Sequence, residues 1–208
     1  METRTPSKGF TLIELLVVIS IISMLASIVL ASLSQARGRS KAVITALQVR
    51  EVERAVNQYV LDTGQYPQTC MEGPCTAASD SFSTSLGVPG WQGPYIKLYN
   101  LAHPWGGHIS FKRGGETSGS PSTATDDADG DGENDYWIFL NDDAPQMLNT
   151  DNSGRIPEAD MIAIDSILDD GNITTGDMRG NGDGLHGTPW IYQHNALGEM
   201  AIKLKLIK

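Results

Sequence analysis

The first apolar block of the chain covers residues 15–33, where no residue is charged. A helix of this stretch, at about 1.5 Å per residue, reaches roughly 28 Å, which is close to the ~30 Å hydrocarbon core of a bilayer. The block is longer than the core of a secretory signal peptide, which has roughly 7–15 apolar residues. The pattern therefore predicts a membrane-spanning helix.

Beyond residue 33 the pattern becomes amphipathic. Apolar residues recur at intervals of three, four and seven positions, which is the spacing of one helix face. The stripe consists of Ala42, Ala46, Val49, Val56 and Val60, widened by Leu47, Val52 and Tyr59. Gly64 and Pro67 end it, because glycine favours a helix C-cap and proline cannot continue the hydrogen-bond ladder. We therefore predict one helix of about 50 residues, with a lipid-facing first half and a second half packed on a domain.

The rest of the chain alternates between turn formers and short segments of β type. Residues 64–90 are rich in Gly, Pro, Ser and Thr and are expected to form loops. Strands are expected at residues 108–112, 135–140, 190–193 and 200–207. The last of these alternates between two sets of side chains, as a half-buried strand does. The pattern predicts an α+β fold, in which a long N-terminal helix packs on a small antiparallel sheet.

The charge of the chain, −10 in total, is unevenly distributed. Residues 126–185 hold most of the 25 acidic residues and only two basic ones, Arg155 and Arg179. A surface of this sign repels nucleic acid and attracts cations. We therefore expect no nucleic-acid binding by the C-terminal half, and look for cation ligands there.

The segment DDADGDGEND, residues 126–135, places oxygen donors at alternate positions around Gly132. Calcium takes about six to eight oxygen ligands at about 2.3–2.6 Å, and a glycine permits the sharp turn between them. The expected ligands are Asp127, Asp129, Asp131 and Asp135. The closing glutamate of a helix-loop-helix site is missing, because Ile138 stands there, so another loop must complete the shell. A solvated acidic loop is the alternative; we favour calcium because adjacent carboxylates repel one another unless neutralised.

A second acidic segment, NTDNSGRIPEAD at residues 149–160, matches the loop spacing more fully but with weaker ligands. Its oxygen donors would be Asn149, Asp151, Ser153 and Asp160. A third segment offers Asp177, Asn181 and Asp183, but Arg179 interrupts it, so we expect it at most to donate to another site. The acidic loops thus predict Ca²⁺ as the cofactor that makes residues 126–160 rigid.

Glu14 is the anomaly of the apolar block. A carboxylate in lipid costs about 2.5–3.5 kcal/mol at the membrane centre and less near an end, and it usually marks function. A cut between Gly9 and Phe10 would create an α-amino group about four residues, or roughly 6 Å, from Glu14 along a helix. The amine of one chain could then meet the carboxylate of a neighbouring chain. We therefore interpret Glu14 as an assembly residue.

The junction KGFTLIELL, at residues 8–16, resembles the class III leader junction of type IV pilins and of the pseudopilins of type II secretion. The resemblance implies that a membrane peptidase cuts after Gly9 and methylates the new N-terminal Phe10. The leader would then be cytoplasmic and the body of the chain would lie outside the cytoplasm. Helices of this family often carry a Gly and a Pro where this chain has Ser23 and Ala31. Without that proline we expect a more continuous helix.

The segment GWQGPYIKLYNLAHPWGGHISFK, residues 90–112, resembles the corresponding part of the major type II pseudopilin, although His103 stands where that family usually has Asp. The aromatic residues Trp91, Tyr95 and Trp105 are expected to anchor this loop to the helix rather than to form a ligand site. The resemblance also implies calcium in a loop after this segment. The region of residues 141–190 is longer than the corresponding region of the usual family member, and we expect it to be an insertion.

The expected organisation is that of a pilin-like fold with long calcium-binding loops. Its parts are a leader at residues 1–9, a transmembrane and assembly helix at 10–33, an amphipathic helix at 34–63, and a globular β-domain at 64–208 whose loop-rich acidic region is 126–185. If the domain is extracytoplasmic, Cys70 and Cys75 are expected to form a disulfide, with two free thiols as the alternative.

No enzyme signature stands out in the sequence. None of the four histidines is in H-E-x-x-H spacing, and no G-x-S-x-G occurs. We therefore expect a structural protein and not an enzyme.

The family resemblance implies a subunit of the pseudopilus of a type II secretion system, held in the inner membrane before it polymerises. Its implied partners are further copies and other pilins in a helical filament, the prepilin peptidase and the inner-membrane assembly platform. One alternative is a pilin of a surface fibre for adhesion, motility or DNA uptake. Another is a membrane-anchored calcium-binding surface protein that does not polymerise.

Overall fold

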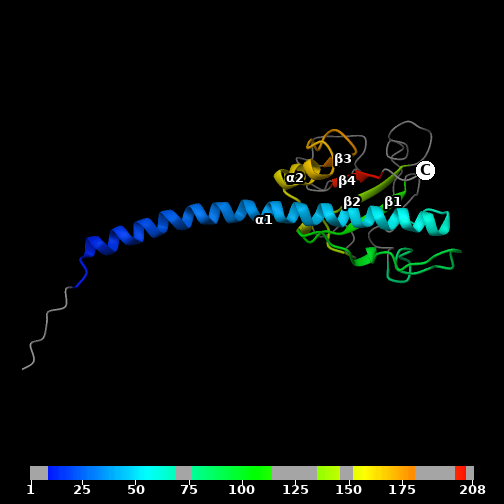
Figure 1. Ribbon diagram of the computed structural model, residues 1–208, viewed down its shortest axis with the longest axis horizontal. Coiled ribbons are helices and arrows are strands. Elements are labelled where there is room, and N and C mark those ends of the chain that lie inside the picture. The colour runs from blue at the N-terminus through cyan, green and yellow to red at the C-terminus, as the bar shows by residue number, and fades with distance from the viewer. Residues whose placement is uncertain (1–8, 69–75, 114–134, 146–151, 181–199, 205–208) are drawn as a thin grey trace, which may run out of the picture. The chain divides into compact units, whose positions relative to one another are not determined.

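The computed structural model (Figure 1) divides into two compact units, Met1–Arg39 and Ser40–Lys208. It describes the stretches 9–68, 76–113, 135–145, 152–180 and 200–204.

Helix α1 runs from Leu12 to Thr63, and its 52 residues form one helix. The helix is continuous at Ser23 and Ala31, which confirms the expectation drawn from the missing proline. It ends where the sequence predicted. Gly64 has a φ of 66° and donates its amide to the Val60 carbonyl at 2.8 Å, which is the geometry of a glycine C-cap.

The first unit contains the apolar block. Its large apolar side chains are exposed in the single chain, as expected for a surface that contacts lipid or other subunits. Four serine hydroxyls donate to the carbonyl oxygen four residues earlier, at 2.7–3.2 Å: Ser20, Ser23, Ser27 and Ser32. These hydroxyls are satisfied within the helix, as a membrane requires. Of the helices that the structure describes, α1 alone is long and apolar enough to span a membrane.

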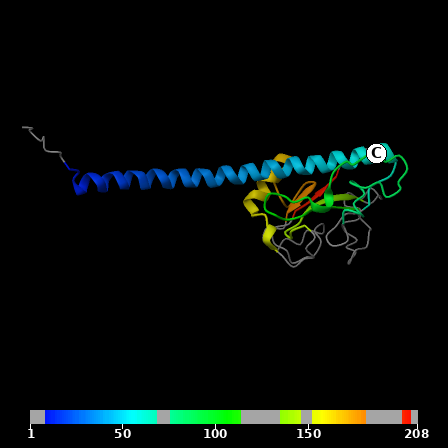
Figure 2. The same ribbon diagram turned by 90° about the horizontal axis from the view of Figure 1, so that it is seen from below.

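The second unit contains a four-stranded antiparallel sheet of order β1-β2-β4-β3. The strands are β1 (Ile109–Arg113), β2 (Tyr136–Leu140), β3 (Met178–Gly180) and β4 (Met200–Lys203). The register places Ile138 of β2 opposite Phe111 of β1 and opposite Ile202 of β4. The sheet lies beside the C-terminal part of α1 in both views (Figure 2).

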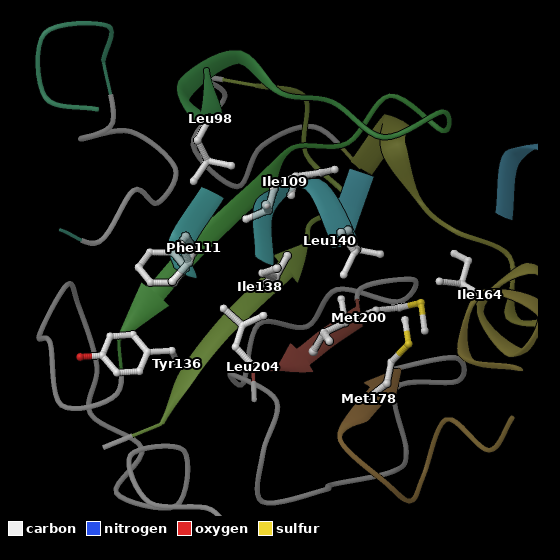
Figure 3. Close-up of a cluster of buried hydrophobic side chains, with 14 of the residues drawn as sticks. Leu98, Ile109, Phe111, Tyr136, Ile138, Leu140, Ile164, Met178, Met200 and Leu204 are labelled. Carbon is white, nitrogen blue, oxygen red and sulfur yellow. The ribbon is translucent and has the colours of Figure 1, made fainter. Parts of the chain in front are cut away.

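The core of the second unit lies on one face of this sheet. One buried cluster joins Val49, Val52 and Val56 of α1 to side chains in and next to the sheet. These side chains are those of Ile109, Phe111, Tyr136, Ile138, Leu140, Met178, Met200 and Leu204 (Figure 3). Trp137, Phe139 and Ala201 form a separate buried cluster. Successive side chains of a strand point to opposite faces, so β2 contributes to both clusters. All five residues of β2 are therefore buried.

The predicted burial is wrong for one residue of the helix stripe. Ala42, Ala46, Val49, Val52, Val56 and Tyr59 are buried as expected, and Val60 is half-buried. Leu47, however, is 64% exposed. Consecutive helix residues are separated by about 100° around the axis, so the side chain next to Ala46 turns away from the sheet.

One α-helix and one strand were not predicted from the sequence. Helix α2 (Glu158–Leu168) begins directly after Pro157, and β3 is a three-residue strand. Strands β1, β2 and β4 confirm three predicted strands, each starting within one residue of the expected position. The fourth predicted strand, at residues 190–193, lies outside the described residues.

Candidate functional site

The bond at which the sequence predicts cleavage lies just before α1. Gly9 and Phe10 are not helical, and the Phe10 side chain is 90% exposed. An added Cβ at Gly9 would meet no atom within 4 Å. An exposed, non-helical segment is what a peptidase can bind, so the geometry is compatible with a cut at this bond. The cut itself stays a prediction.

Glu14 caps the start of its own helix. The Thr11 amide donates to Glu14 Oε2 at 2.7 Å, and the Thr11 hydroxyl donates to the same oxygen at 2.8 Å. In return, the Glu14 amide donates to Thr11 Oγ at 3.3 Å. This reciprocal pattern is a capping box, in which Ser or Thr at the N-cap and Glu three residues later satisfy each other's backbone amides.

The capping box adds a role for Glu14 that the sequence argument missed. We expected the amine of a neighbouring chain as the partner of this carboxylate, but within one chain it already has two hydrogen-bond donors from Thr11. The T-x-x-E spacing was legible in the sequence and is the signal that would have found it. All three hydrogen bonds lie on the C-terminal side of the expected cut between Gly9 and Phe10, so cleavage would leave them in place.

The loop before the sheet is held to α1 by aromatic side chains, as predicted. The Tyr95 hydroxyl donates to Asp62 Oδ2 at 2.9 Å, and the Tyr95 ring makes an edge contact with Tyr59, with 5.5 Å between the ring centroids. Lys41 of the same helix places its Nζ 5.3 Å from the Trp105 ring centroid, within the range of a cation–π interaction. These residues are core anchors, and their polar atoms bind within the chain.

Trp91 holds the loop to a second loop instead of to the helix. Its indole Nε1 donates to the Ser81 carbonyl at 3.0 Å, and its ring contacts Tyr95 edge to face, with 5.7 Å between the centroids. Its anchoring of the helix is therefore indirect, through Tyr95.

Asp80 is a buried carboxylate that sequence reasoning did not single out. Its side chain is buried completely. It accepts hydrogen bonds from the amides of Phe82, Leu98 and Tyr99, at 3.0, 2.9 and 3.3 Å. Leu98 and Tyr99 belong to the short 3₁₀ helix η1 (Leu98–Asn100). Asp80 thus fixes η1 to the preceding loop, and this network of three donors satisfies a carboxylate in the core.

His103 is the buried first residue of a turn at the edge of the sheet. Its amide donates to the Gly107 carbonyl at 2.9 Å, and the Gly106 amide donates to the His103 carbonyl at 2.8 Å. The ring Nε2 lies 2.8 Å from the Asn141 carbonyl, which can only accept, so Nε2 carries the hydrogen. Burial lowers the pKa of His103 to about 4. This histidine is therefore a neutral side chain that fastens the turn to the residue after β2.

The predicted metal ligands fall into two groups. One group lies outside the described residues and consists of Asp127, Asp129, Asp131, Asn149, Asp151, Asn181 and Asp183. The predicted disulfide partners, Cys70 and Cys75, also lie outside the described residues. Of the others, Asp135 places its Oδ1 2.9 Å from Lys203 Nζ. Ser153 lies in the 3₁₀ helix η2 (Asn152–Gly154), and Asp160 lies in the first turn of α2. The loops at 126–135 and 149–160 therefore stay predictions.

A different set of carboxylates comes together in the described part of the chain. Asp165, Asp169 and Asp170 each offer an oxygen, and the three oxygens lie within 4.8 Å of one another. Among the described His, Cys, Asp and Glu residues no other group of three is this close. Asp135 and Asp160 do not belong to it. These three residues do not have the spacing of a calcium loop, so the sequence pattern did not predict them as a set.

Comparison with known proteins decides the family. Residues 4–30 match the prokaryotic N-terminal methylation motif. Residues 32–138, half of the chain, match the family described as type II secretion system (T2SS), protein G. The chain belongs to the protein G family of type II secretion systems. Helix α2 and the group formed by Asp165, Asp169 and Asp170 lie beyond the matched residues.

Curated relatives of this protein G family member are of two kinds. The type II secretion system core protein G of Xanthomonas campestris pv. campestris is 29% identical over 118 residues, which cover 55% of this chain and 77% of the relative. The protein of the same name from Pseudomonas aeruginosa is 28% identical over 108 residues, covering 46% of this chain and 75% of the relative. The type IV major pilin protein PilE1 of Neisseria gonorrhoeae is 36% identical over 77 residues, which cover 37% of this chain and 36% of the relative. No solved structure matches.

These matches establish the general role of the protein. A protein G family member with pilin relatives and a methylation motif is a pilin-like structural subunit that associates with other pilins. The apolar segment of α1, together with the family, makes it a single-pass, membrane-anchored protein. Its relatives are structural subunits and not enzymes.

Proposed function

We propose that the chain is a subunit of the pseudopilus of a type II protein secretion system. The observation that carries this proposal is the match of residues 32–138 to protein G. The two protein G relatives support it, because the match to this chain covers 77% of the Xanthomonas campestris protein and 75% of the Pseudomonas aeruginosa protein. The match to PilE1 covers 36% of that pilin. The protein G relation therefore extends over more of the fold.

In this proposal a prepilin peptidase cuts between Gly9 and Phe10 and methylates the new terminus. The mature chain then waits in the inner membrane as a single-span protein whose domain lies outside the cytoplasm. An assembly platform extracts it into a growing helical filament. The exposed position of the bond before α1 supports the first step, and the apolar surface of α1 supports the second.

The amine of Phe10 on one subunit would bind Glu14 of its neighbour. Both Thr11 donors bind Oε2 of Glu14, so Oε1 is the atom we assign to the neighbour's amine. The capping box would orient the carboxylate for this contact, because it fixes the side chain against the helix start. An ion pair in lipid would then set the axial register of the two helices.

Calcium and the disulfide remain part of the proposal. The acidity of residues 126–160 supports bound Ca²⁺, since so many carboxylates need a counter-charge. Of the first loop, Asp135 is an ion-pair partner of Lys203, so the ion and Lys203 would share this carboxylate. If chelation leaves the melting temperature of the protein unchanged, calcium has no place in the function.

A surface pilin is the second candidate, and the pilin relatives favour it. They include the type IV wide pilus major component PilA4 of Thermus thermophilus, 37% identical over 60 residues, which cover 29% of this chain and 46% of the relative. Deleting the gene distinguishes the two functions. For a pseudopilin, the deletion strain should lose secreted proteins from the medium and keep its surface fibres, and the wild-type gene should restore secretion. Loss of surface fibres with normal secretion would contradict the proposal.

A further inference from the structure

Three aspartates gather at the C-terminal end of α2. Asp165 lies in the last turn of this helix, Asp169 is its C-cap residue and Asp170 follows. One oxygen from each carboxylate lies within 4.8 Å of the other two. Oxygens that surround one ion at about 2.3–2.6 Å are separated by at most about 5 Å. The three side chains can therefore contact the same cation with little movement.

Asp165 is buried and incompletely satisfied. Its exposed fraction is 0%, and its Oδ1 accepts the Gly171 amide at 2.5 Å. Its Oδ2 is also buried and has no hydrogen-bond partner among the residues described. A buried carboxylate oxygen without a donor or cation is destabilising. Oδ2 of Asp165 is therefore a buried acceptor whose hydrogen-bonding capacity is unused.

The position in the helix makes this deficit larger. The C-terminal end of a helix carries a partial negative charge, which cations stabilise and carboxylates do not. The last turn of α2 contains no basic residue. Neither Asp165 nor Asp169 forms an ion pair with a lysine or arginine in the stretches that the structure describes. A bound cation would neutralise both the carboxylates and the helix end.

The loop after α2 holds the other two carboxylates in place. Oδ2 of Asp169 accepts the amides of Asp177 and Met178, at 2.6 and 3.1 Å. Oδ1 of Asp170 accepts the Asn172 amide at 2.8 Å. These bonds fix the side chains, so little conformational entropy is lost when an ion binds. They also connect the group to β3, which starts at Met178.

We propose that Asp165, Asp169 and Asp170 bind a divalent cation, with Ca²⁺ as the ion that fits best. Carboxylate oxygens are the ligands of hard cations, and the larger, flexible shell of Ca²⁺ requires less exact placement of the three oxygens than the compact octahedron of Mg²⁺. The ion would fasten the end of α2 to β3. This site is separate from the acidic loops at 126–135 and 149–160, and it does not depend on the proposed function.

Hydrogen exchange of the full chain in detergent micelles tests the site. The protein is stripped with a chelator, and amide exchange is followed by mass spectrometry with and without millimolar CaCl₂. We expect slower exchange at residues 165–178, because the ion closes the helix end and the loop. The same ionic strength supplied as NaCl should give no protection. Unchanged exchange at these residues with CaCl₂, or equal protection by NaCl, would overturn the site.

Substitutions separate this site from the acidic loops. Asp165→Asn removes the charge at nearly constant volume, and Asp170→Asn does so at an exposed position. Each should abolish the calcium protection at 165–178 and lower the number of bound Ca²⁺ ions by one. The double variant Asp127→Asn/Asp129→Asn is the matched control and should keep the protection. Full calcium protection in a folded Asp170→Asn variant and in Asp165→Asn would contradict the proposal, whereas protection by MgCl₂ as well as by CaCl₂ would support a divalent site.

Discussion

Glu14 combines two physical roles that different substitutions can separate. Its carboxylate accepts the amide and hydroxyl of Thr11, which caps α1. It is also the negative charge of the apolar segment and the proposed partner of a neighbour's amine. Glutamine can fill the third helical position of a capping box but carries no charge. Alanine can do neither.

We therefore expect Glu14→Gln to keep the helix start and to lose filament assembly. Thr11→Ala should do the opposite: it should weaken the helix start by about 1 kcal/mol and still assemble, because the charge remains. Cross-linking of neighbouring subunits in membranes, or counting of sheared filaments, measures assembly. If Glu14→Gln assembled as well as the wild type, the carboxylate would serve only as a cap and the intersubunit pairing would be wrong.

Asp80 is the residue whose removal should cost the domain most among its carboxylates with described partners. Asp80→Ala leaves the amides of Phe82, Leu98 and Tyr99 without an acceptor in the core. Each buried donor left unpaired costs about 1–3 kcal/mol, so we expect a loss of at least about 3 kcal/mol in the free energy of unfolding. Asp62→Ala is the control, because the two donors that lose their acceptor, the Tyr95 hydroxyl and the exposed Gln58 amide, are not deep in the core. Denaturant unfolding of the full chain in detergent would measure both, and equal losses would contradict the role of Asp80.

The two buried histidines predict a dependence of stability on pH. Burial lowers the pKa of both His103 and His108 to about 4, whereas an unfolded histidine titrates near pH 6.5. The unfolded state therefore binds more protons between these values. Stability is fully present above about pH 6.5 and is lost as the pH falls towards about 4, by on the order of 3 kcal/mol for each histidine.

The same unfolding measurement, made between about pH 7 and about pH 4, tests this dependence of stability on pH. Lys41 and His108 lie near the His103 ring and add to the cost of charging it. The His103→Gln variant should be less stable at neutral pH but should lose less stability on acidification than the wild type. Parallel curves for the two proteins would show that His103 does not contribute to the acid sensitivity.

The long elements of this protein were predictable from sequence, and the short ones were not. Helix α1 has a sustained apolar period and a glycine stop at Gly64, so its course and its end follow from local rules. Strand β3 has three residues and forms only because Met178 pairs with Ile202 of β4. Such a strand depends on distant partners, which a local pattern does not contain.

The candidate sites follow the same division. The capping box of Thr11 and Glu14 is local, and its spacing stood in the sequence. The carboxylates of Asp165 and Asp169 could not be grouped without knowing that α2 ends between them. Helix α2 was overlooked because its surroundings read as acidic loops, although Met161, Ile164 and Asp165 have the spacing of one helix face and are buried.

Helix α2 should contribute to stability through one side only. Ile164 is completely buried, whereas Ile162 is 39% exposed. Replacing a buried isoleucine by alanine costs about 2–5 kcal/mol, because apolar contacts are lost and a cavity remains. We expect a loss in this range for Ile164→Ala and less than about 1 kcal/mol for Ile162→Ala, measured by denaturant unfolding. Equal losses would mean that α2 does not pack as described.

As a complete molecule, the protein exposes an apolar segment that needs lipid or other subunits around it. Large side chains from Leu12 to Leu30 have exposed fractions of about half or more in the single chain. The second unit, by contrast, has its own buried core. The first unit therefore supplies the surface for membrane insertion and assembly. In the proposed function, the membrane-anchored subunit becomes competent to assemble through one event, the exposure of a new N-terminus at Phe10.

Mass spectrometry of the N-terminal peptide, on protein purified from its assembled filament, tests this event most directly. We predict a chain that starts at Phe10 with a methylated amine, because only this terminus supplies the cation that would pair with Glu14 of a neighbour. A filament whose subunits still carry residues 1–9 would contradict the account, since the α-amino group would then lie far from Glu14.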